Sequence, residues 1–164
     1  MSIEITIRDL APSDIDTIVT IALAAWQPVY DSYRHIMGKE IFAAAYPHWR
    51  QQKAREIRNV CEPAAGAMVC VAERDGRAVG FAAAYVNKRT GMGHIGNNAV
   101  HPEYQTQGIA TRMYTHLLNR LRASGMQVAK VYTGGDPSHA PARRAYEKVG
   151  FHVTVPSVAY YRKL

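Results

Sequence analysis

Cysteine is scarce in this sequence. Cys61 and Cys70 are the only two cysteines. They form no Cys-x-x-Cys pair, and no histidine stands near them at the spacing of a zinc site. The sequence therefore lacks the signs of a disulfide framework and of a metal centre, and we expect two free thiols and no bound metal.

Long apolar runs are also missing. No stretch approaches the roughly 20 residues of a membrane-spanning helix. Met1 to Arg8 places charged residues among alternating apolar ones, which is unlike a signal peptide. With 164 residues, 48% of them apolar and 20% charged, the chain can bury one substantial core. We expect a single cytoplasmic domain, residues 1–164, with no membrane contact.

Acidic residues are outnumbered, 13 against 20 basic ones, which gives a net charge of +7 and an isoelectric point near 9.6. This balance favours an anionic partner, such as nucleic acid, a membrane surface or a phosphorylated cofactor. The densest basic set has no interleaved aromatic residues on which bases could stack, and consists of Arg50, Lys53, Arg55 and Arg58. We interpret this set as a solvated face and do not expect nucleic acid as a partner.

Hydrophobic periodicity predicts an α/β (α+β) chain. The first half is expected to contain a strand at 3–8, a helix at 13–26 and helical sequence at 38–60, which Pro47 should kink or split. Strands at 68–72, 78–86 and 94–100 should follow. The rest is expected to contain a helix at 107–125, a strand at 128–132, a short helix ending at 148 and two final strands within 151–161. Asp75-Gly76 suits a tight hairpin turn. This order predicts a mixed, mostly antiparallel sheet of six or seven strands, flanked by helices on both faces.

The segment Gln105-Thr106-Gln107-Gly108-Ile109-Ala110 lies between a predicted strand and a predicted helix. Free backbone amides and the positive end of the helix dipole gather at such a helix start, and small residues let a diphosphate approach them. Close packing of the helix on the strand is an ordinary alternative explanation for the same small residues. The segment is therefore a candidate pyrophosphate site.

Two motifs resemble those of the GNAT family of N-acetyltransferases. The first is the family's Val-x-Pro followed by Gln-x-x-Gly-x-Ala, which here is filled by Val100, Pro102, Gln105, Gly108 and Ala110. The second is Ala-x-x-x-Tyr-Glu-Lys-x-Gly-Phe, from Ala142 to Phe151. Two positions depart from the pattern: Thr106 stands where Gly or Arg is frequent, and His139 stands where Asn is usual. The resemblance implies the GNAT fold, with a splayed central pair of parallel strands.

By this resemblance the cofactor is acetyl-coenzyme A (acetyl-CoA), whose pantetheine arm runs between the strand at 98–100 and the strand at 128–132. Its diphosphate meets the amides of residues 107–111. The residues implied in cofactor binding are Asn98, Ala99, Val100, Gln105, Thr106, Gln107, Gly108, Ile109, Ala110, Thr111, His139, Ala142 and Tyr146.

The resemblance also implies catalytic roles. Tyr146 is the candidate general acid for the departing thiolate, although a core tyrosine on an amphipathic helix would look the same. The backbone amide of Val100 points at the thioester carbonyl. His94 is a candidate base, because its even spacing from Val100 should put both side chains on one strand face, but a structural or solvent-facing histidine is the alternative.

The first two helices are expected to select the acceptor amine. Trp26, Tyr30, Tyr33, Arg34 and His35 are candidates, and Trp26 could instead be the last core residue of its helix. The predicted function is acetyl transfer from acetyl-CoA to a small-molecule or peptide primary amine, by direct attack in a ternary complex. A non-catalytic acyl-CoA-binding regulator and a toxin that acetylates aminoacyl-tRNA are the alternatives, and a homodimer is left open.

Overall fold

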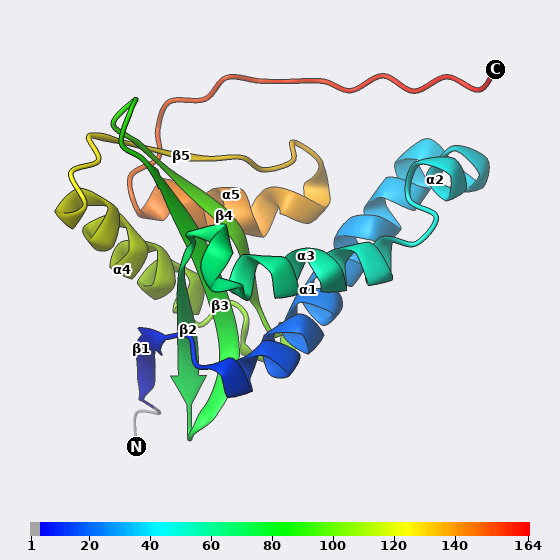
Figure 1. Ribbon diagram of the computed structural model, residues 1–164. Helices are drawn as coiled ribbons and strands as arrows, with labels where there is room; N and C mark the ends of the chain where they lie inside the picture. The colour runs from blue at the N-terminus through cyan, green and yellow to red at the C-terminus, as the bar shows by residue number, and fades with distance from the viewer. Residues whose placement is uncertain (1–3) are drawn as a thin grey trace.

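The computed structural model describes residues 4–164 and shows one mixed sheet with helices on both faces (Figure 1). Its strands are β1 (Ile5–Asp9), β2 (Met68–Arg74), β3 (Arg77–Asn87), β4 (Met92–Val100) and β5 (Val128–Val131). They lie in the order β1-β2-β3-β4-β5. Only β4 and β5 run parallel, and the other neighbours are antiparallel. The prediction of a mixed, mostly antiparallel sheet is confirmed. Ile3, at the start of the first expected strand, lies outside the described residues.

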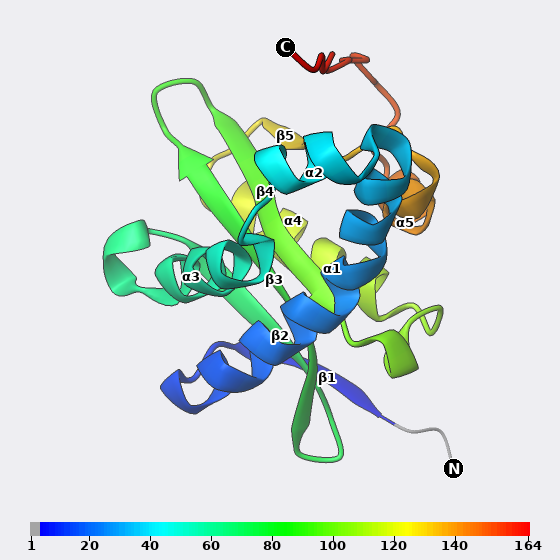
Figure 2. The ribbon, with the colours of Figure 1, turned by 90° about the vertical axis from the view of Figure 1, so that its right-hand side faces the viewer.

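Over residues 4–164, five α-helices surround the sheet: α1 (Ile15–Met37), α2 (Lys39–Ala45), α3 (Trp49–Cys61), α4 (Ile109–Ala123) and α5 (Ala140–Lys148). Helices α1 and α3 cover one face of the sheet, and α4 and α5 cover the other (Figure 2). None of the helices within residues 4–164 has both the length and the apolar character of a membrane span.

Helix α1 runs beyond the expected end at Trp26, through Pro28 to Met37. The apolar spacing continues past the proline, because Val29 is buried and Tyr30 and Tyr33 are half-buried. Tertiary packing thus outweighs the local cost of a proline within the helix. Trp26 lies inside the helix, so its description as the last core residue of that helix is wrong.

Two local predictions hold in the turns. Pro47 separates α2, which ends at Ala45, from α3, which begins at Trp49. Asp75 and Gly76 have φ values of 52° and 73°, the positive values that both central residues of a type I′ hairpin require. The split helix and the β2–β3 hairpin are therefore confirmed.

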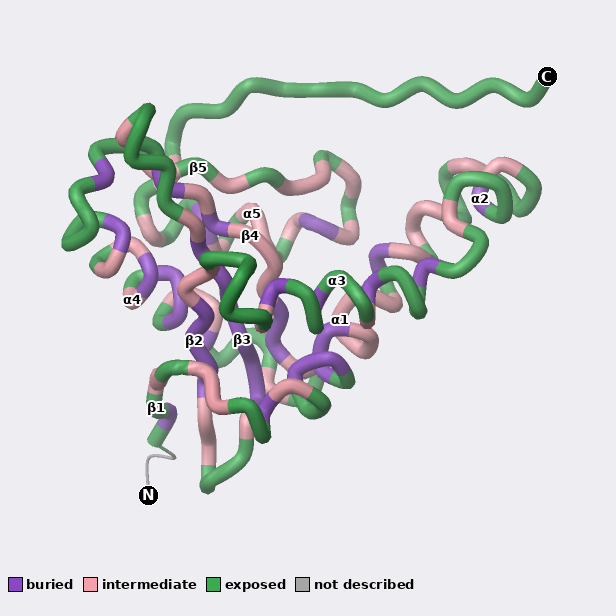
Figure 3. Tube along the Cα trace, viewed as in Figure 1, coloured by how far each residue is buried: buried purple, intermediate pink, exposed green. Residues whose placement is uncertain are grey.

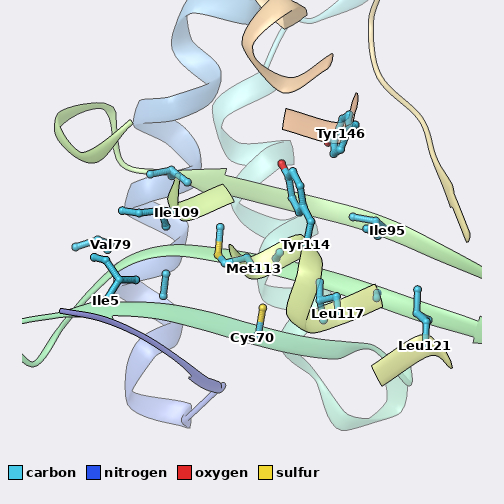
Figure 4. Close-up of a cluster of buried hydrophobic side chains, with 14 of the residues drawn as sticks. Ile5, Cys70, Val79, Ile95, Ile109, Met113, Tyr114, Leu117, Leu121 and Tyr146 are labelled. Carbon is cyan, nitrogen blue, oxygen red and sulfur yellow. The ribbon is translucent and has the colours of Figure 1, made fainter. Parts of the chain in front are cut away.

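The larger of the core clusters lies between the sheet and α4 (Figure 4). Met113, Tyr114, Leu117 and Leu121 of α4 are fully or almost fully buried in it. Cys70 lies in the same cluster, where burial raises the pKa of its thiol to about 12. Both cysteines are free thiols, as predicted.

The expected sixth and seventh strands are not formed, and the prediction of six or seven strands is wrong by that amount. Residues 151–164, here called the C-terminal arm, have no regular secondary structure. The arm has the apolar alternation of a strand, but no ladder of backbone hydrogen bonds within residues 4–164 joins it to another strand. Phe151 is partly buried, and the residues after it are exposed (Figure 3).

Candidate active site

The start of α4 is built to present free backbone amides. Thr106 and Gly108 both have positive φ, 63° and 76°, and they turn the chain from β4 into the helix. Within residues 4–164, no hydrogen bond is formed by the backbone N–H groups of Ile109, Ala110 and Thr111, and the helix has no side-chain cap. These donors and the helix dipole suit a diphosphate.

Gly108 also decides between the two explanations of the small residues. A Cβ added to Gly108 would meet nothing within 4 Å, so packing of helix on strand does not require glycine there. Its positive φ does favour glycine. The open space above Gly108 lies next to the free amides, as a diphosphate site needs.

An arginine that the sequence analysis missed lies beside this turn. Arg74 of β2 donates from Nη1 to Gln107 Oε1 at 3.1 Å, and its guanidinium carbon lies 5.3 Å from the ring centre of Tyr104. Its positive charge adds to that of the helix start. Only the fold brings it there, because Arg74 is far from Gln107 in the sequence.

Strands β4 and β5 separate where the site begins. Their pairing covers only Met92 to Ile95 of β4, so in the described part of the chain the later residues of β4 have no partner strand on that side. The N–H of His101 donates to Val79 O at 2.9 Å. By the alternation of an antiparallel pair, the N–H of Val100 therefore points away from β3, into the gap. Gln105 Nε2 donates to the carbonyl oxygen of Val100 at 3.0 Å on the same side.

Tyr146 of α5 lies at this gap, almost fully buried. Its hydroxyl oxygen accepts a hydrogen bond from Asn98 Nδ2 at 3.1 Å, while Tyr114 donates to Asn98 Oδ1 at 2.6 Å. Figure 4 shows Tyr114 pointing toward Tyr146. Within residues 4–164, the hydroxyl of Tyr114 is the other group that hydrogen-bonds with the Tyr146 hydroxyl. Burial raises the pKa of Tyr146, and the hydrogen bonds with Asn98 and Tyr114 oppose this.

The expectation that His94 shares a face with Val100 is wrong. Gly96 and Asn97 of β4 lie opposite the single residue Ala83 of β3, which makes a β-bulge. An extra residue reverses the alternation beyond it. Val100 consequently packs in the cluster with α4, whereas His94 pairs with Tyr85 on the face that α3 covers.

His94 also lies where β4 and β5 are still hydrogen-bonded, in register with Lys130. Its pKa is lowered by burial and by the positive charge of Lys130. The side chain of Ala99 packs on the α1 side of the sheet, so any contact it makes in the gap is through its backbone. Ala142 packs against the cluster that contains Tyr146.

The acceptor candidates Trp26, Tyr30 and Tyr33 form an aromatic group with residues of α2 and α3. Tyr30 stacks on Trp49 with 4.1 Å between ring centres, and Tyr33 stacks on Tyr46 at 5.7 Å. Burial raises the pKa of both Tyr30 and Tyr33, which keeps their hydroxyls neutral. The further candidates Arg34 and His35 are exposed on the last turn of α1.

His139 is held in a polar network against this aromatic group. Its Nδ1 lies 2.5 Å from Asp136 Oδ1, and its ring packs on Trp26 and Tyr33. Burial alone would raise the pKa of Asp136, but hydrogen bonds from Ser138, His139 and Ser32 lower it to about 2. His139 thus faces α1, and its predicted contact with pantetheine stays a prediction.

An ion pair between the buried Lys53 and the exposed Glu56 of α3 was also missed. Lys53 is buried, with Nζ 3.9 Å from the ring centre of Trp26 and 2.7 Å from Glu56 Oε2. Glu56 Oε1 accepts a hydrogen bond from Asn97 of the bulge at 2.9 Å. The interpretation of the basic set as a solvated face is therefore wrong for Lys53, although Arg50, Arg55 and Arg58 are exposed. Helical spacing alone could have placed Lys53 beside Ile57 and Val60, on the buried side.

Comparison with known proteins agrees with the motifs. The family model described as "Acetyltransferase (GNAT) family" matches residues 26–151. A curated relative, the mycothiol acetyltransferase of Streptomyces avermitilis, is 31% identical over 114 residues, which are 66% of this chain and 36% of that protein. The chain therefore spans little more than a third of that relative's length.

Two solved structures show the same fold. The PaiA N-acetyltransferase of Thermoplasma acidophilum, in complex with coenzyme A, superposes with a TM-score of 0.72 at 17% identity and covers 94% of this chain and 93% of its own. The ribosomal-protein-S18-alanine N-acetyltransferase of Escherichia coli superposes with a TM-score of 0.65 at 19% identity. That match covers 93% of this chain and 80% of the other chain. The family's cofactor is acetyl-CoA, and the residues at the start of α4 fit its diphosphate. On the family match, the two motifs and the fold, the chain belongs to the GNAT acetyltransferase family.

Proposed function

We propose that this protein transfers the acetyl group of acetyl-CoA to a primary amine by direct attack in a ternary complex. The observation that carries the proposal is the hydroxyl of Tyr146, which Asn98 of β4 holds at the opening between β4 and β5. A donor group is thus available where the pantetheine arm of the cofactor would end.

Each group of residues at the site has its own role in the proposed reaction. Acetyl-CoA supplies an activated acetyl group as a thioester. The amides of Ile109, Ala110 and Thr111 bind the diphosphate. The N–H of Val100 donates a hydrogen bond to the carbonyl oxygen, which becomes more negative as the amine attacks. Tyr146 donates its proton to the departing sulfur.

Glu56 is the better-placed proton acceptor for the amine. Asn97 and Asn98 are consecutive residues of β4. Asn97 donates a hydrogen bond to the Glu56 carboxylate on the α3 face of the sheet, and Asn98 donates one to the Tyr146 hydroxyl on the α4 face. An amine that attacks from the α3 side has Glu56 nearby, and Tyr146 lies beyond the thioester. His94 is the rival base, but it lies along the part of β4 that β5 still covers.

The surroundings of Glu56 suggest a cationic amine on an apolar or aromatic group. Coulombic interaction with its carboxylate adds to the effect of burial in raising the pKa of Tyr30 and Tyr85. A carboxylate beside aromatic rings attracts an ammonium group both as a counter-ion and through cation–π contact. Lys53 already uses both interactions, through Glu56 and Trp26.

The test of the proposed function is release of free thiol from acetyl-CoA with a panel of small amines, peptide N-termini and lysine peptides. We expect turnover with at least one class. Tight binding of acetyl-CoA without thiol release from any amine would contradict the proposal and favour the regulator. Release with aminoacyl-tRNA alone would favour the toxin.

The cofactor site has a matched pair of variants at the two ends of α4. Gly108 and Gly125 both have positive φ, and neither has an atom within 4 Å of an added Cβ. We expect Gly108→Glu to abolish binding of acetyl-CoA by calorimetry, because its carboxylate would lie where phosphate must bind. Gly125→Glu should suffer the same backbone strain and keep the affinity. Equal affinity of the two variants would refute the diphosphate site.

A further inference from the structure

Lys53 is a charged residue on the buried side of α3. The other buried residues of this helix are apolar: Trp49, Ile57 and Val60. Lys53 is only 6% exposed, and lysine is almost never buried to this degree unless its charge is paired. Burial of an ammonium group has a desolvation cost that an apolar side chain at the same position would not have. Packing therefore does not explain why this residue is a lysine.

The ammonium group of Lys53 contacts a ring of α1 and a carboxylate of its own helix. Nζ lies 3.9 Å from the ring centre of Trp26 and donates a hydrogen bond to Glu56 Oε2 at 2.7 Å. Charged residues three apart on a helix also pair on an exposed surface, so pairing with Glu56 does not require burial. The face of Trp26 adds a cation–π attraction, which is stronger at a desolvated site. The ion pair is therefore anchored at its lysine end.

The carboxylate of Glu56 is held at both of its oxygens. Oε2 accepts from Lys53, and Oε1 accepts from Asn97 Nδ2 of β4 at 2.9 Å. A glutamate side chain without such partners samples several rotamers, which it loses when it is fixed. The two hydrogen bonds hold this side chain in one orientation, while 48% of it stays exposed. A carboxylate that is fixed and still accessible can receive a proton from another molecule.

The hydrogen bond with Asn97 keeps Glu56 close to the place where the sheet opens. Asn97 belongs to the bulge of β4, and the pairing of β4 with β5 ends two residues earlier, at Ile95. Helices α1 and α3 lie together on this face of the sheet (Figure 2). Proton transfer needs the base within hydrogen-bond distance of the amine, and a displacement of about 1 Å can lower a rate about 100-fold. The rate of the proposed reaction should therefore depend on how firmly Glu56 is held.

We propose that Lys53 is a positioning residue, whose ammonium group packs on Trp26 and holds the Glu56 carboxylate against Asn97 for proton transfer from the acceptor amine. This inference rests on the acetyl transfer proposed above. The amine gives its proton to Glu56, and Lys53 neither gains nor loses one, because it acts only through the orientation of the carboxylate. A buried charge that lowers stability and serves the reaction is a trade-off that enzymes commonly show.

The first test compares Lys53→Met with Arg55→Met in thiol release, and thermal melting checks that both fold. Arg55 is an exposed basic residue of the same helix, so the control removes the same charge. We expect Lys53→Met to lower kcat about 10-fold or more, with the KM for acetyl-CoA unchanged, and Arg55→Met to change neither. In a Glu56→Gln background, Lys53→Met should change kcat less than about 2-fold, because Lys53 acts through Glu56. An unchanged kcat in Lys53→Met, an equal loss in both backgrounds, or full kcat in Glu56→Gln alone would each overturn the proposal.

The second test measures how firmly Glu56 is held, without acetyl transfer. The side-chain amide of Asn97, assigned from the NMR signal that Asn97→Asp removes, reports on its hydrogen bond with Glu56 through the ¹⁵N order parameter. We expect this amide to be rigid in the unaltered chain and in Arg55→Met, and mobile in Lys53→Met. Equal order in the three proteins would overturn the proposal. A failure of the proposed function is a different result, namely no thiol release with any amine, and the order parameter can be measured in either case.

Discussion

Replacing Tyr146 by phenylalanine should separate catalysis from stability. The ring is kept, so no cavity forms, and the variant loses only the hydroxyl that accepts from Asn98. The Nδ2 group of Asn98 keeps a second partner, the carbonyl oxygen of Gly96 at 3.0 Å. The loss of stability should therefore be about 1 kcal/mol. Loss of a general acid should lower kcat about 100-fold or more, with the affinity for acetyl-CoA unchanged.

Tyr114→Phe is the matched control in the same network. It removes the donor to Asn98 Oδ1, for which no second partner is found within residues 4–164, at a cost of about 1–3 kcal/mol. We thus expect Tyr114→Phe to be the less stable variant and Tyr146→Phe the less active one. Thiol release and thermal melting measure both. Equal activity of the two variants would refute the role of Tyr146 as the acid.

The pH dependence of kcat gives an independent check. Tyr146 can donate only while it is protonated, and burial raises its pKa above the ordinary value of 10.0. Ionisation of this group therefore removes activity only at a pH above that value. In the unaltered protein, ionisation of Tyr146 should not lower kcat between about pH 7 and 9. A decline in that interval that Tyr146→Phe abolishes would show that its pKa is lowered instead.

Three further predictions concern stability. In Gly93→Ala the added Cβ would lie 2.7 Å from Leu121, so overpacking should cost about 1–3 kcal/mol in denaturant unfolding. The hydrogen bond from Arg8 lowers the pKa of Asp14, so this carboxylate stabilises the fold above its ordinary pKa of 3.8. The advantage of the unaltered protein over Asp14→Asn should shrink as the pH falls below that value, and a constant difference in acid unfolding curves would contradict this. Lys53→Met should keep the free energy of unfolding within about 1 kcal/mol or raise it, as judged from thermal melting, because methionine removes the desolvation cost of the buried ammonium while Glu56, 48% exposed, stays hydrated.

Features that depend on neighbouring residues could be predicted from the sequence. Asp75-Gly76 requires little beyond its own dihedral angles to form a hairpin, and Pro47 ends a helix by lacking an N–H. The turn at Gly108 is also local, because a positive φ there orients the following amides. The motifs of the GNAT family add to this local information, which is why the sequence already indicated the family and its cofactor.

Features that depend on pairing between distant segments could not be predicted. The sequence of residues 94–100 does not indicate the bulge, because the bulge is defined by the register of β4 against β3. The bulge reverses the face of the sheet on which each later side chain of β4 lies. The pairing of Glu56 with Asn97 similarly exists only once α3 packs on the sheet. The geometry places His94 and Val100 on different faces of the sheet, and for this reason we propose Glu56 as the base.

The bulge in β4 accounts for the position of the site between the two helical layers. An unbulged strand with Ile95 facing α4 would turn Asn98 toward α3, away from Tyr146. The extra residue instead returns Asn98 and Val100 to the α4 side while Asn97 remains on the α3 side. Pairing with β5 ends just before the same point. One inserted residue thus coincides with the opening of the sheet and places Tyr146, the proposed proton donor, and Glu56, the proposed proton acceptor, on its two faces.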